Sequence, residues 1–175
     1  MNIPDWHEEP IAKSHDRKRF DCSDAELNTF LAKHARQNHE AGSSKAFCAI
    51  DDLDPKRVLG FYTLAPVSIG LHQMPAPLAR GLPQHDVGGY LLARIATSIE
   101  MQRKGLGGQL LLAAGKRCLR VAAEAGGSLL VIDAKNDRAA AWYEGYGALR
   151  MADMSLKFVL PLATIRLALE AADKF

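Results

Sequence analysis

The chain has 175 residues, of which 48% are hydrophobic and 24% are charged, and its formal net charge at pH 7 is +2. This balance is typical of a globular protein and excludes a long disordered chain. Charged residues interrupt every apolar run, which excludes a membrane span, and residues 1–20 lack the apolar core of a signal peptide. We therefore expect one domain over residues 1–175, located in the cytoplasm.

The first third of the chain predicts a helix and then a hairpin. Ser23 and Glu26 match a capping box, and apolar residues at helical spacing follow them, so a helix is expected over residues 24–41. The stretches "KAFCAID" (45–51) and "RVLGFYTLAPVSIGL" (57–71) have the composition of strands. Turn residues between them favour a hairpin.

The middle of the chain predicts a parallel strand–helix–strand unit. The segment "QMPAPLARGLPQHDVGG" (73–89) is rich in proline and glycine and is interpreted as a connection with room for one helical turn. The apolar runs "YLLARIATSI" (90–99) and "SLLVIDA" (128–134) are typical of buried strands. Between them a helix is expected over residues 105–125. Its expected buried side carries Leu106, Leu110, Ala114 and Val121.

The last part of the chain predicts a helix, a strand and a terminal helix. The first of these spans residues 137–146 and is capped by Asn136. The strand is "LKFVLPL" (156–162), and the terminal helix is "ATIRLALEAADK" (163–174).

Three cysteines, Cys22, Cys48 and Cys118, lie far apart, and no C-x-x-C pair occurs. This pattern indicates neither a disulfide framework nor a zinc site. We expect reduced, buried thiols and no metal.

A cluster of glycines marks the start of the helix at 105–125. Backbone N–H groups at a helix start point outward with the positive end of the dipole behind them, and glycines let a diphosphate approach them. The cluster is followed by Gln109 and not by the Lys-Ser/Thr of a Walker loop, and the third glycine of a dinucleotide fingerprint is missing. A pyrophosphate cradle is therefore favoured, with a glycine-rich packing turn as the alternative. Its residues are Gln102, Arg103, Lys104, Gly105, Leu106, Gly107 and Gly108.

Two motifs resemble those of the GNAT superfamily of N-acetyltransferases. The stretch "QRKGLGG" resembles the Q/R-x-x-G-x-G/A loop, and "NDRAAAWYEGYGA" resembles N-x-x-A-x-x-x-Y-x-x-x-G-F at Asn136, Ala139, Tyr143 and Gly147. Ala148 stands where the family has phenylalanine. The resemblance implies an α/β (α+β) fold with a central mixed, twisted sheet flanked by helices on both faces. It also implies acetyl-CoA as co-substrate, with its pyrophosphate on the loop and with Asn136 and Ala139 among the residues that bind it.

A narrower resemblance covers nearly the whole chain. The segments "HDRKRFDCSDAELNTFLAKHARQNHEAG", "LGFYTLAPVSI", "LLARIA" and "LKFVLPLATI" are similar to the GNAT toxins of bacterial toxin–antitoxin pairs. This implies a toxin that acetylates the amino acid on charged tRNA and blocks translation. It also implies a ribbon-helix-helix antitoxin as partner and makes a homodimer expected.

Tyr143 is the candidate general acid, because a phenol is protonated at neutral pH and can donate to the departing thiolate. The alternative for Tyr143 is a core tyrosine, and Tyr146 shares its helix face. The family implies backbone donors to the oxyanion around Ile95, Ala96 and Thr97. No clear general base is visible: Glu100 and Asp133 are interpreted as surface or capping carboxylates.

The cationic residues proposed to bind tRNA are Arg94, Arg117 and Arg120. Arg117 and Arg120 share a helix face, and Arg94 needs a partner or a ligand because it lies in an apolar strand. Two other functions stay open. One is N-acetylation of a small-molecule or protein amine, and the other is a non-catalytic module that binds CoA or a protein.

Overall fold

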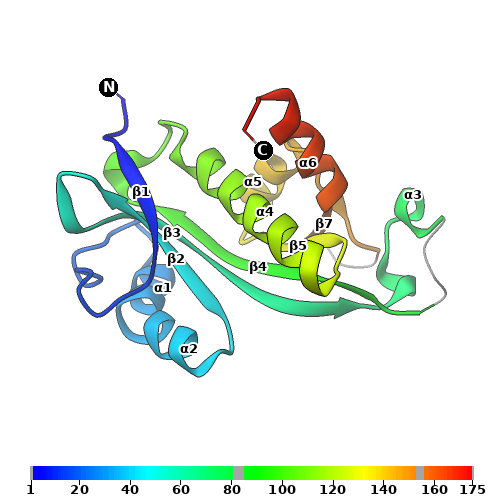
Figure 1. Ribbon diagram of the computed structural model, residues 1–175, viewed down its shortest axis with the longest axis horizontal. Coiled ribbons are helices and arrows are strands. Elements are labelled where there is room, and N and C mark those ends of the chain that lie inside the picture. Colours follow the sequence, from blue (N-terminus) through cyan, green and yellow to red (C-terminus); the bar gives the residue numbers. More distant parts are fainter. Residues whose placement is uncertain (1, 81–84, 153–155, 175) are drawn as a thin grey trace. The chain divides into compact units, whose positions relative to one another are not determined.

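The computed structural model describes residues 2–80, 85–152 and 156–174. Within them the chain folds into two compact units. Figure 1 traces the helices and strands along the chain. The first unit contains Met1–Ala65 and Arg94–Ala113, and the second contains Pro66–Ala93 and Ala114–Phe175. Each unit is therefore assembled from two separate stretches of sequence.

A mixed β-sheet forms the framework of the fold. In the part of the chain that the structure describes it has seven strands in the order β1-β2-β3-β4-β5-β7-β6. They are β1 (Trp6–Pro10), β2 (Lys45–Asp51), β3 (Asp54–Ile69), β4 (Val87–Thr97), β5 (Leu129–Asp133), β6 (Leu149–Arg150) and β7 (Lys157–Pro161). Strands β1–β2, β2–β3, β5–β7 and β6–β7 pair antiparallel, whereas β4–β5 is parallel.

Helices flank this sheet, which confirms the expected α/β class. Those of the described residues are α1 (Ala25–Thr29), α2 (Ala35–Ala41), α3 (Ala76–Ala79), α4 (Leu106–Ala125), α5 (Asp137–Glu144) and α6 (Leu162–Ala171). Shorter helical turns lie at Phe30–His34, which is π-helical, and at Leu71–Gln73 and Ile99–Met101, which are 3-10.

In the first unit, helices cover both faces of the strands. Successive residues of a strand point to opposite faces, so Gly60 and Phe61 of β3 lie on opposite faces of the sheet. The Phe61 ring stacks on Phe30 with ring centroids 6.3 Å apart. On the other side, a β-carbon at Gly60 would lie 2.8 Å from the side chain of Leu110 in α4. The glycine therefore permits α4 to approach the sheet closely.

The helix expected over residues 24–41 is present, but a π-helical turn divides it into α1 and α2. The predicted capping residue is wrong by one position. The carboxylate of Asp24 accepts two backbone N–H groups of the first turn of α1, and Asp24 has the extended backbone of an N-cap. Ser23 instead has a φ of 66°. The helix ends at Gly42, as predicted, with a φ of 80°.

In the second unit, the predicted parallel strand–helix–strand arrangement is confirmed. Strand β4 pairs with β5 from Gly89–Leu129 to Leu92–Ile132, and α4 connects the two strands along the chain. The antiparallel strand β7 lies on the other side of β5. This order places β5 between two neighbours, which explains its nearly complete burial.

The predicted buried side of α4 is correct at three of four positions. Leu106, Leu110 and Ala114 are fully buried, but Val121 is 45% exposed. Cys118 continues the buried line instead, because steps of four residues follow one line along a helix.

Two short strands, β1 and β6, are not among the predicted elements. The five residues of β1 read "WHEEP", and β6 has two residues, so neither has an alternating apolar pattern. The connection expected over residues 73–89 contains the four-residue helix α3. Residues 81–84 of that connection lie outside the described residues.

Charged side chains hold β1 near the turn between β2 and β3. The backbone N–H of Ala12 donates to His15 Nδ1, so His15 Nε2 carries the proton that it donates to Glu9, at 2.6 Å. The other oxygen of Glu9 lies 2.7 Å from His7 Nε2, and His7 Nδ1 lies 2.6 Å from Asp52. A carboxylate therefore faces each nitrogen of His7, which favours the charged imidazolium.

The three cysteines are buried and form no disulfide among the described residues, as predicted. Burial raises the pKa of the Cys48 and Cys118 thiols to about 12. These thiols therefore stay protonated and unreactive at neutral pH. None of the helices in the described ranges is long and apolar enough to cross a membrane.

Candidate active site

The side chain of Gln102 fixes the loop that precedes α4. Its amide donates to the carbonyl of Thr97 at 3.2 Å and to the carbonyl of Cys22 at 3.0 Å. These two bonds tie the loop to the end of β4 and to the segment before α1. The position of Gln102 in the glycine motif thus has a structural reason: the loop is held by a side chain at its first residue.

The backbone of this loop contains two residues with positive φ. Arg103 has a φ of 62° and Gly105 has a φ of 94°, and a β-carbon at Gly105 would meet nothing within 4 Å. The N–H of Gln109 donates to the carbonyl of Gly105. The N–H groups of Leu106 and Gly107, which precede it in α4, thus have no intrahelical acceptor. Open space beside helix-start donors fits a diphosphate group.

Strand β4 extends beyond its parallel pairing with β5. The parallel pairing with β5 ends at Leu92, whereas β4 continues through Ile95 and Ala96 to Thr97. Ala96 is buried, and Ile95 and Thr97 are half-buried. These three residues therefore lie beyond the stretch that pairs with β5, as oxyanion donors would require.

Arg94 has a partner within the first unit. Its guanidinium carbon lies 3.8 Å from the ring centroid of Phe30, which is a cation–π contact. This contact explains how an arginine is accommodated in an apolar strand. A role of Arg94 toward tRNA stays a prediction.

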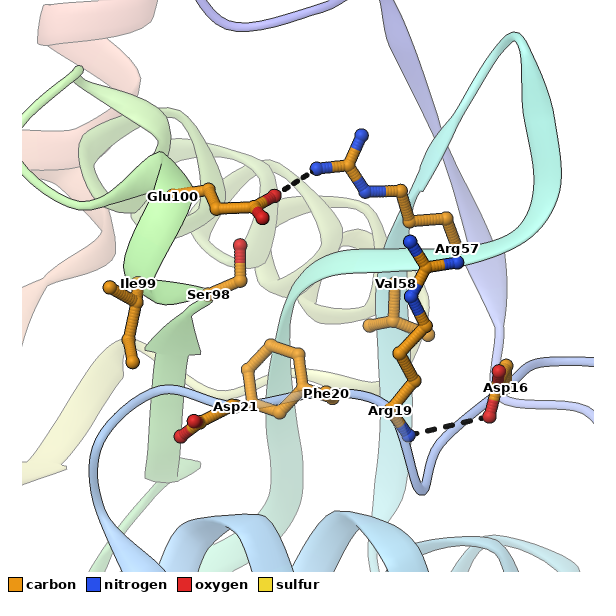
Figure 2. Close-up of a pocket in the computed structure, with 9 residues that line it drawn as sticks. All are labelled: Asp16, Arg19, Phe20, Asp21, Arg57, Val58, Ser98, Ile99 and Glu100. Carbon is orange, nitrogen blue, oxygen red and sulfur yellow. Dashed lines mark hydrogen bonds and ion pairs between the residues drawn. The ribbon is translucent and has the colours of Figure 1, made fainter.

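A pocket of about 260 Å³ adjoins the 3-10 turn that leads into the loop. Figure 2 shows that charged side chains surround its apolar residues, with Arg57 extended toward Glu100. Arg57 also pairs with Asp51 at 3.0 Å. Glu100 is therefore held in an ion pair, as a surface carboxylate would be. The lining residues are Asp16, Arg19, Phe20, Asp21, Arg57, Val58, Ser98, Ile99 and Glu100.

Sequence reasoning did not find this pocket. Its residues come from three separate segments, and none of the local spacings joins them.

Helix α5 of the second unit carries the residues of the other motif. The side chain of Asn136 caps the helix by accepting the N–H of Ala139 at 2.9 Å, as predicted. This bond explains the asparagine of the motif, because an N-cap side chain reaches the backbone N–H three residues later.

Tyr143 lies one helical turn further along α5 and is 4% exposed. Burial raises the pKa of the Tyr143 phenol, so its hydroxyl keeps its proton at neutral pH. Among the described residues no hydrogen bond involves this hydroxyl. Tyr146, the alternative candidate, is 40% exposed. A phenol that keeps its proton at neutral pH, with no protein hydrogen-bond partner among the described residues, still has that proton to give, which a general acid requires.

The remaining predicted residues occupy the second unit as follows. Arg117 and Arg120 lie three residues apart on α4, where Arg117 is half-buried and Arg120 is exposed. Asp133, at the end of β5, pairs with Lys157 at 3.5 Å. That ion pair agrees with the interpretation of Asp133 as a surface carboxylate.

Comparisons with known proteins identify relatives that match most of the chain, although no protein-family model matches it. A tRNA-acetylating toxin of Mycobacterium tuberculosis is 34% identical over 133 residues, which cover 76% of this chain and 78% of that protein. A probable toxin TacT of Sinorhizobium fredii is 28% identical over 160 residues, which cover 87% and 88%.

Solved structures have the same fold. The toxin AtaT in complex with acetyl-methionyl-tRNAfMet matches with a TM-score of 0.87 and 23% identity, over 94% of this chain and 99% of that chain. A tyrosine-to-phenylalanine mutant of AtaT, bound to the C-terminus of the antitoxin AtaR and to acetyl-CoA, matches with a TM-score of 0.80 and 22% identity, over 94% and 98%. The 34% identity to the mycobacterial protein, over 76% of this chain, shows that the chain belongs to the family of GNAT-type tRNA-acetylating toxins.

Proposed function

We propose that this chain is an acetyl-CoA-dependent N-acetyltransferase toxin that acetylates the α-amine of aminoacyl-tRNA and thereby blocks translation. The observation that carries the proposal is the loop at the start of α4, with open space at Gly105 and outward N–H groups, in a chain of this family. Such a loop serves a donor with a diphosphate, and acetyl-CoA has one.

The loop would hold acetyl-CoA through its backbone. The N–H groups of residues 104–108 donate to the pyrophosphate oxygens, and the helix dipole of α4 favours the negative charge. Arg103 and Lys104 add two exposed cations at the same place. Asn136 and Ala139 act indirectly in this proposal, because their capping bond fixes the start of α5.

The residues then act on the acetyl transfer in a defined order. The α-amine attacks the thioester carbonyl, and the N–H groups of Ile95, Ala96 and Thr97 stabilise the oxyanion that forms. When the C–S bond breaks, the hydroxyl of Tyr143 donates its proton to the departing thiolate. The products are N-acetyl-aminoacyl-tRNA and CoA.

The proton lost by the amine needs an acceptor, and water can serve. The neighbouring ester lowers the basicity of the amine, so a substantial fraction is neutral near physiological pH. The ion pairs of Glu100 with Arg57 and of Asp133 with Lys157 support this assignment, because both carboxylates are already engaged.

Three further features belong to the proposal. Arg94, Arg117 and Arg120 contact tRNA phosphates. A ribbon-helix-helix antitoxin neutralises the chain, since the structurally similar AtaT is bound by its antitoxin AtaR. The active form is a homodimer, which doubles the cationic surface available to one tRNA.

The decisive experiment supplies the purified chain with labelled acetyl-CoA and four acceptors: bulk charged tRNA, uncharged tRNA, polyamines and protein. We expect label on charged tRNA alone, with arrest of cell-free translation, because uncharged tRNA has no α-amine. A Tyr143→Phe variant is the matched control, since it lacks one hydroxyl.

Label on polyamines or protein without label on charged tRNA would reject the toxin function and leave an acetyltransferase. The absence of any acetyl transfer, with normal acetyl-CoA binding, would favour a non-catalytic module.

A further inference from the structure

One face of α5 and of the turn that follows it presents exposed aromatic and cationic side chains. Arg138, Trp142 and Tyr146 recur at intervals of four residues, which places them along one line of the helix. The helical backbone continues past Glu144, since Gly145 has a φ of −60° and the Tyr146 N–H donates to the carbonyl of Tyr143. We name this row the α5 stripe.

The Trp142 ring of the stripe contacts both the proposed general acid and Tyr146. The Trp142 ring centroid lies 5.0 Å from that of Tyr143 and 5.1 Å from that of Tyr146, with edge-on geometry in both pairs. Trp142 thus links the buried Tyr143 to the exposed Tyr146.

Trp142 is 38% exposed and Tyr146 is 40% exposed, whereas Tyr143 is 4% exposed. Adjoining large aromatic side chains left half in water typically mark a binding surface.

The charges around the stripe favour an anionic ligand. Arg138 is exposed and makes no ion pair among the described residues. Glu144, an acidic residue of α5, is paired with Arg150 at 3.2 Å, which reduces its repulsion of an anion. Asp137 is the other acidic residue of α5 and lies in its first turn, where it interacts with the helix dipole.

We propose that the α5 stripe binds the unpaired nucleotides at the 3′ end of the acceptor tRNA. Bases stack on Trp142 and Tyr146, and a backbone phosphate contacts Arg138. This inference rests on the proposed function.

The argument comes from the chemistry of the substrate. The acceptor amine is joined through an ester to the terminal ribose, so the terminal bases must come near Tyr143 when the amine reacts. The nearest exposed rings are those of the stripe. Stacking of bases on aromatic side chains, with phosphates on arginine, is how proteins bind single-stranded nucleic acid without reading its sequence. The stripe is therefore expected to act on every tRNA, because all share the same 3′ end.

A fluorescence experiment tests the stripe without measuring catalysis. The chain has two tryptophans, so the Trp6→Phe variant leaves Trp142 as the sole reporter. Uncharged tRNA that ends in CCA should quench this emission by stacking, while the same tRNA trimmed of its last three nucleotides should bind without quenching. Equal quenching by both RNAs, or no quenching at saturation by the intact one, would overturn the proposal.

Kinetics with charged tRNA gives the second test. Tyr146→Leu and Trp142→Leu should each raise the KM for aminoacyl-tRNA by roughly 5- to 150-fold, the usual worth of one stacked base. The KM for acetyl-CoA should stay unchanged. Tyr146→Phe and Trp142→Phe keep a ring and should restore most of the loss. Leu167→Ala, which removes an exposed apolar side chain of α6, is the matched control.

The outcomes separate the stripe from the proposed function. If no charged tRNA is acetylated, the proposed function fails. The fluorescence result still shows whether the α5 stripe binds the 3′ end of tRNA. If the leucine variants weaken binding of an antitoxin peptide and leave the KM for tRNA unchanged, the stripe is an antitoxin surface and our inference is wrong.

Discussion

The loop before α4 and the helix α5 both carry motif residues, but the loop contributes backbone groups and the helix contributes side chains. The loop offers backbone: Gly105 leaves open space, and Gln102 holds the loop in place by two hydrogen bonds. Helix α5 offers side chains: a buried phenol at Tyr143 and two exposed rings beside it. In the first region a side chain must be absent, and in the second a side chain must be present. Substitutions should therefore damage binding in one region and chemistry in the other.

The largest effect is expected at Tyr143. Tyr143→Phe removes the donor of the thiolate proton, so turnover should fall by roughly 10²–10⁴, the typical contribution of general acid catalysis. Acetyl-CoA affinity should be nearly unchanged, because the ring remains. Single-turnover acetylation of charged tRNA measures the first quantity and calorimetry measures the second. If Tyr146→Phe has this loss and Tyr143→Phe does not, the assignment of the acid is wrong.

A smaller effect is expected at Gly107. Gly107→Val places a branched side chain at the helix start, where the diphosphate must approach, so acetyl-CoA affinity should fall on the order of 100-fold or more, about 2.7 kcal/mol. Ala123→Val is the matched control, since it adds the same branched side chain at an exposed position of α4. Normal affinity of the Gly107 variant by calorimetry would contradict the backbone cradle.

A substitution at Gln102 tests whether acetyl-CoA binding requires the two hydrogen bonds that fix the loop. Gln102→Ala deletes two hydrogen bonds to backbone carbonyls, and the loss should weaken acetyl-CoA binding about 10-fold, since one such bond contributes about 1 kcal/mol. The fold should persist, with its melting temperature lowered by a few degrees. Gln37→Ala, on the exposed side of α2, is the control. Equal affinities for both variants would show that the loop keeps its shape without this anchor.

Titration gives the smallest effect, and it concerns strand β1, which belongs to neither region. Hydrogen bonds to Asp52 and then Glu9 raise the pKa of His7 above its usual value, and hydrogen bonds from His15 and then His7 lower the pKa of Glu9. Because its pKa is raised in the folded state, His7 stabilises the fold fully below about pH 6.5. This stabilisation is lost as the pH rises through the folded pKa of His7. Because its pKa is lowered in the folded state, Glu9 stabilises the fold fully above about pH 4.3. This stabilisation is lost as the pH falls through the folded pKa of Glu9.

Both contributions are present together between about pH 4.3 and 6.5. His7→Gln should therefore cost most in this window, by less than about 1 kcal/mol because both groups are exposed to solvent. Urea unfolding at several pH values measures the difference. His85→Gln is the control, since the His85 ring contacts a backbone carbonyl and, within residues 2–80, 85–152 and 156–174, no carboxylate. A cost that does not vary with pH would contradict the ionic origin.

Much of the fold could be predicted because its strands are long and apolar. Strand β2 spans the residues expected, and α4 begins within one residue of its predicted start. The edge strands could not be predicted, because β1 is stabilised by pairing with β2 and by the ionic contacts of Glu9, which are distant in sequence. The π-helical turn at Phe30–His34 has no local sequence signal either.

The candidate site was predictable where a motif fixes local geometry. Asn136 makes the capping bond expected of it, because that bond joins residues only three positions apart. Gln102 bonds to Thr97 nearby, but its second bond, to Cys22, spans 80 residues and has no local signal. The contact of Arg94 with Phe30 and the pair of Arg57 with Glu100 join residues that are far apart in the chain. The exposure of Trp142 also depends on what packs around α5, which spacing does not reveal.

Strand β1 ends the strand order, so its outer edge faces no further strand among the described residues. It carries His7, Glu8 and Glu9 in succession and closes with Pro10, which has no N–H to offer. Charged side chains and proline on an edge strand prevent another strand from adding to the sheet. Copies of this chain are therefore protected against edge-to-edge aggregation at β1, and the proposed homodimer would have to use a different surface.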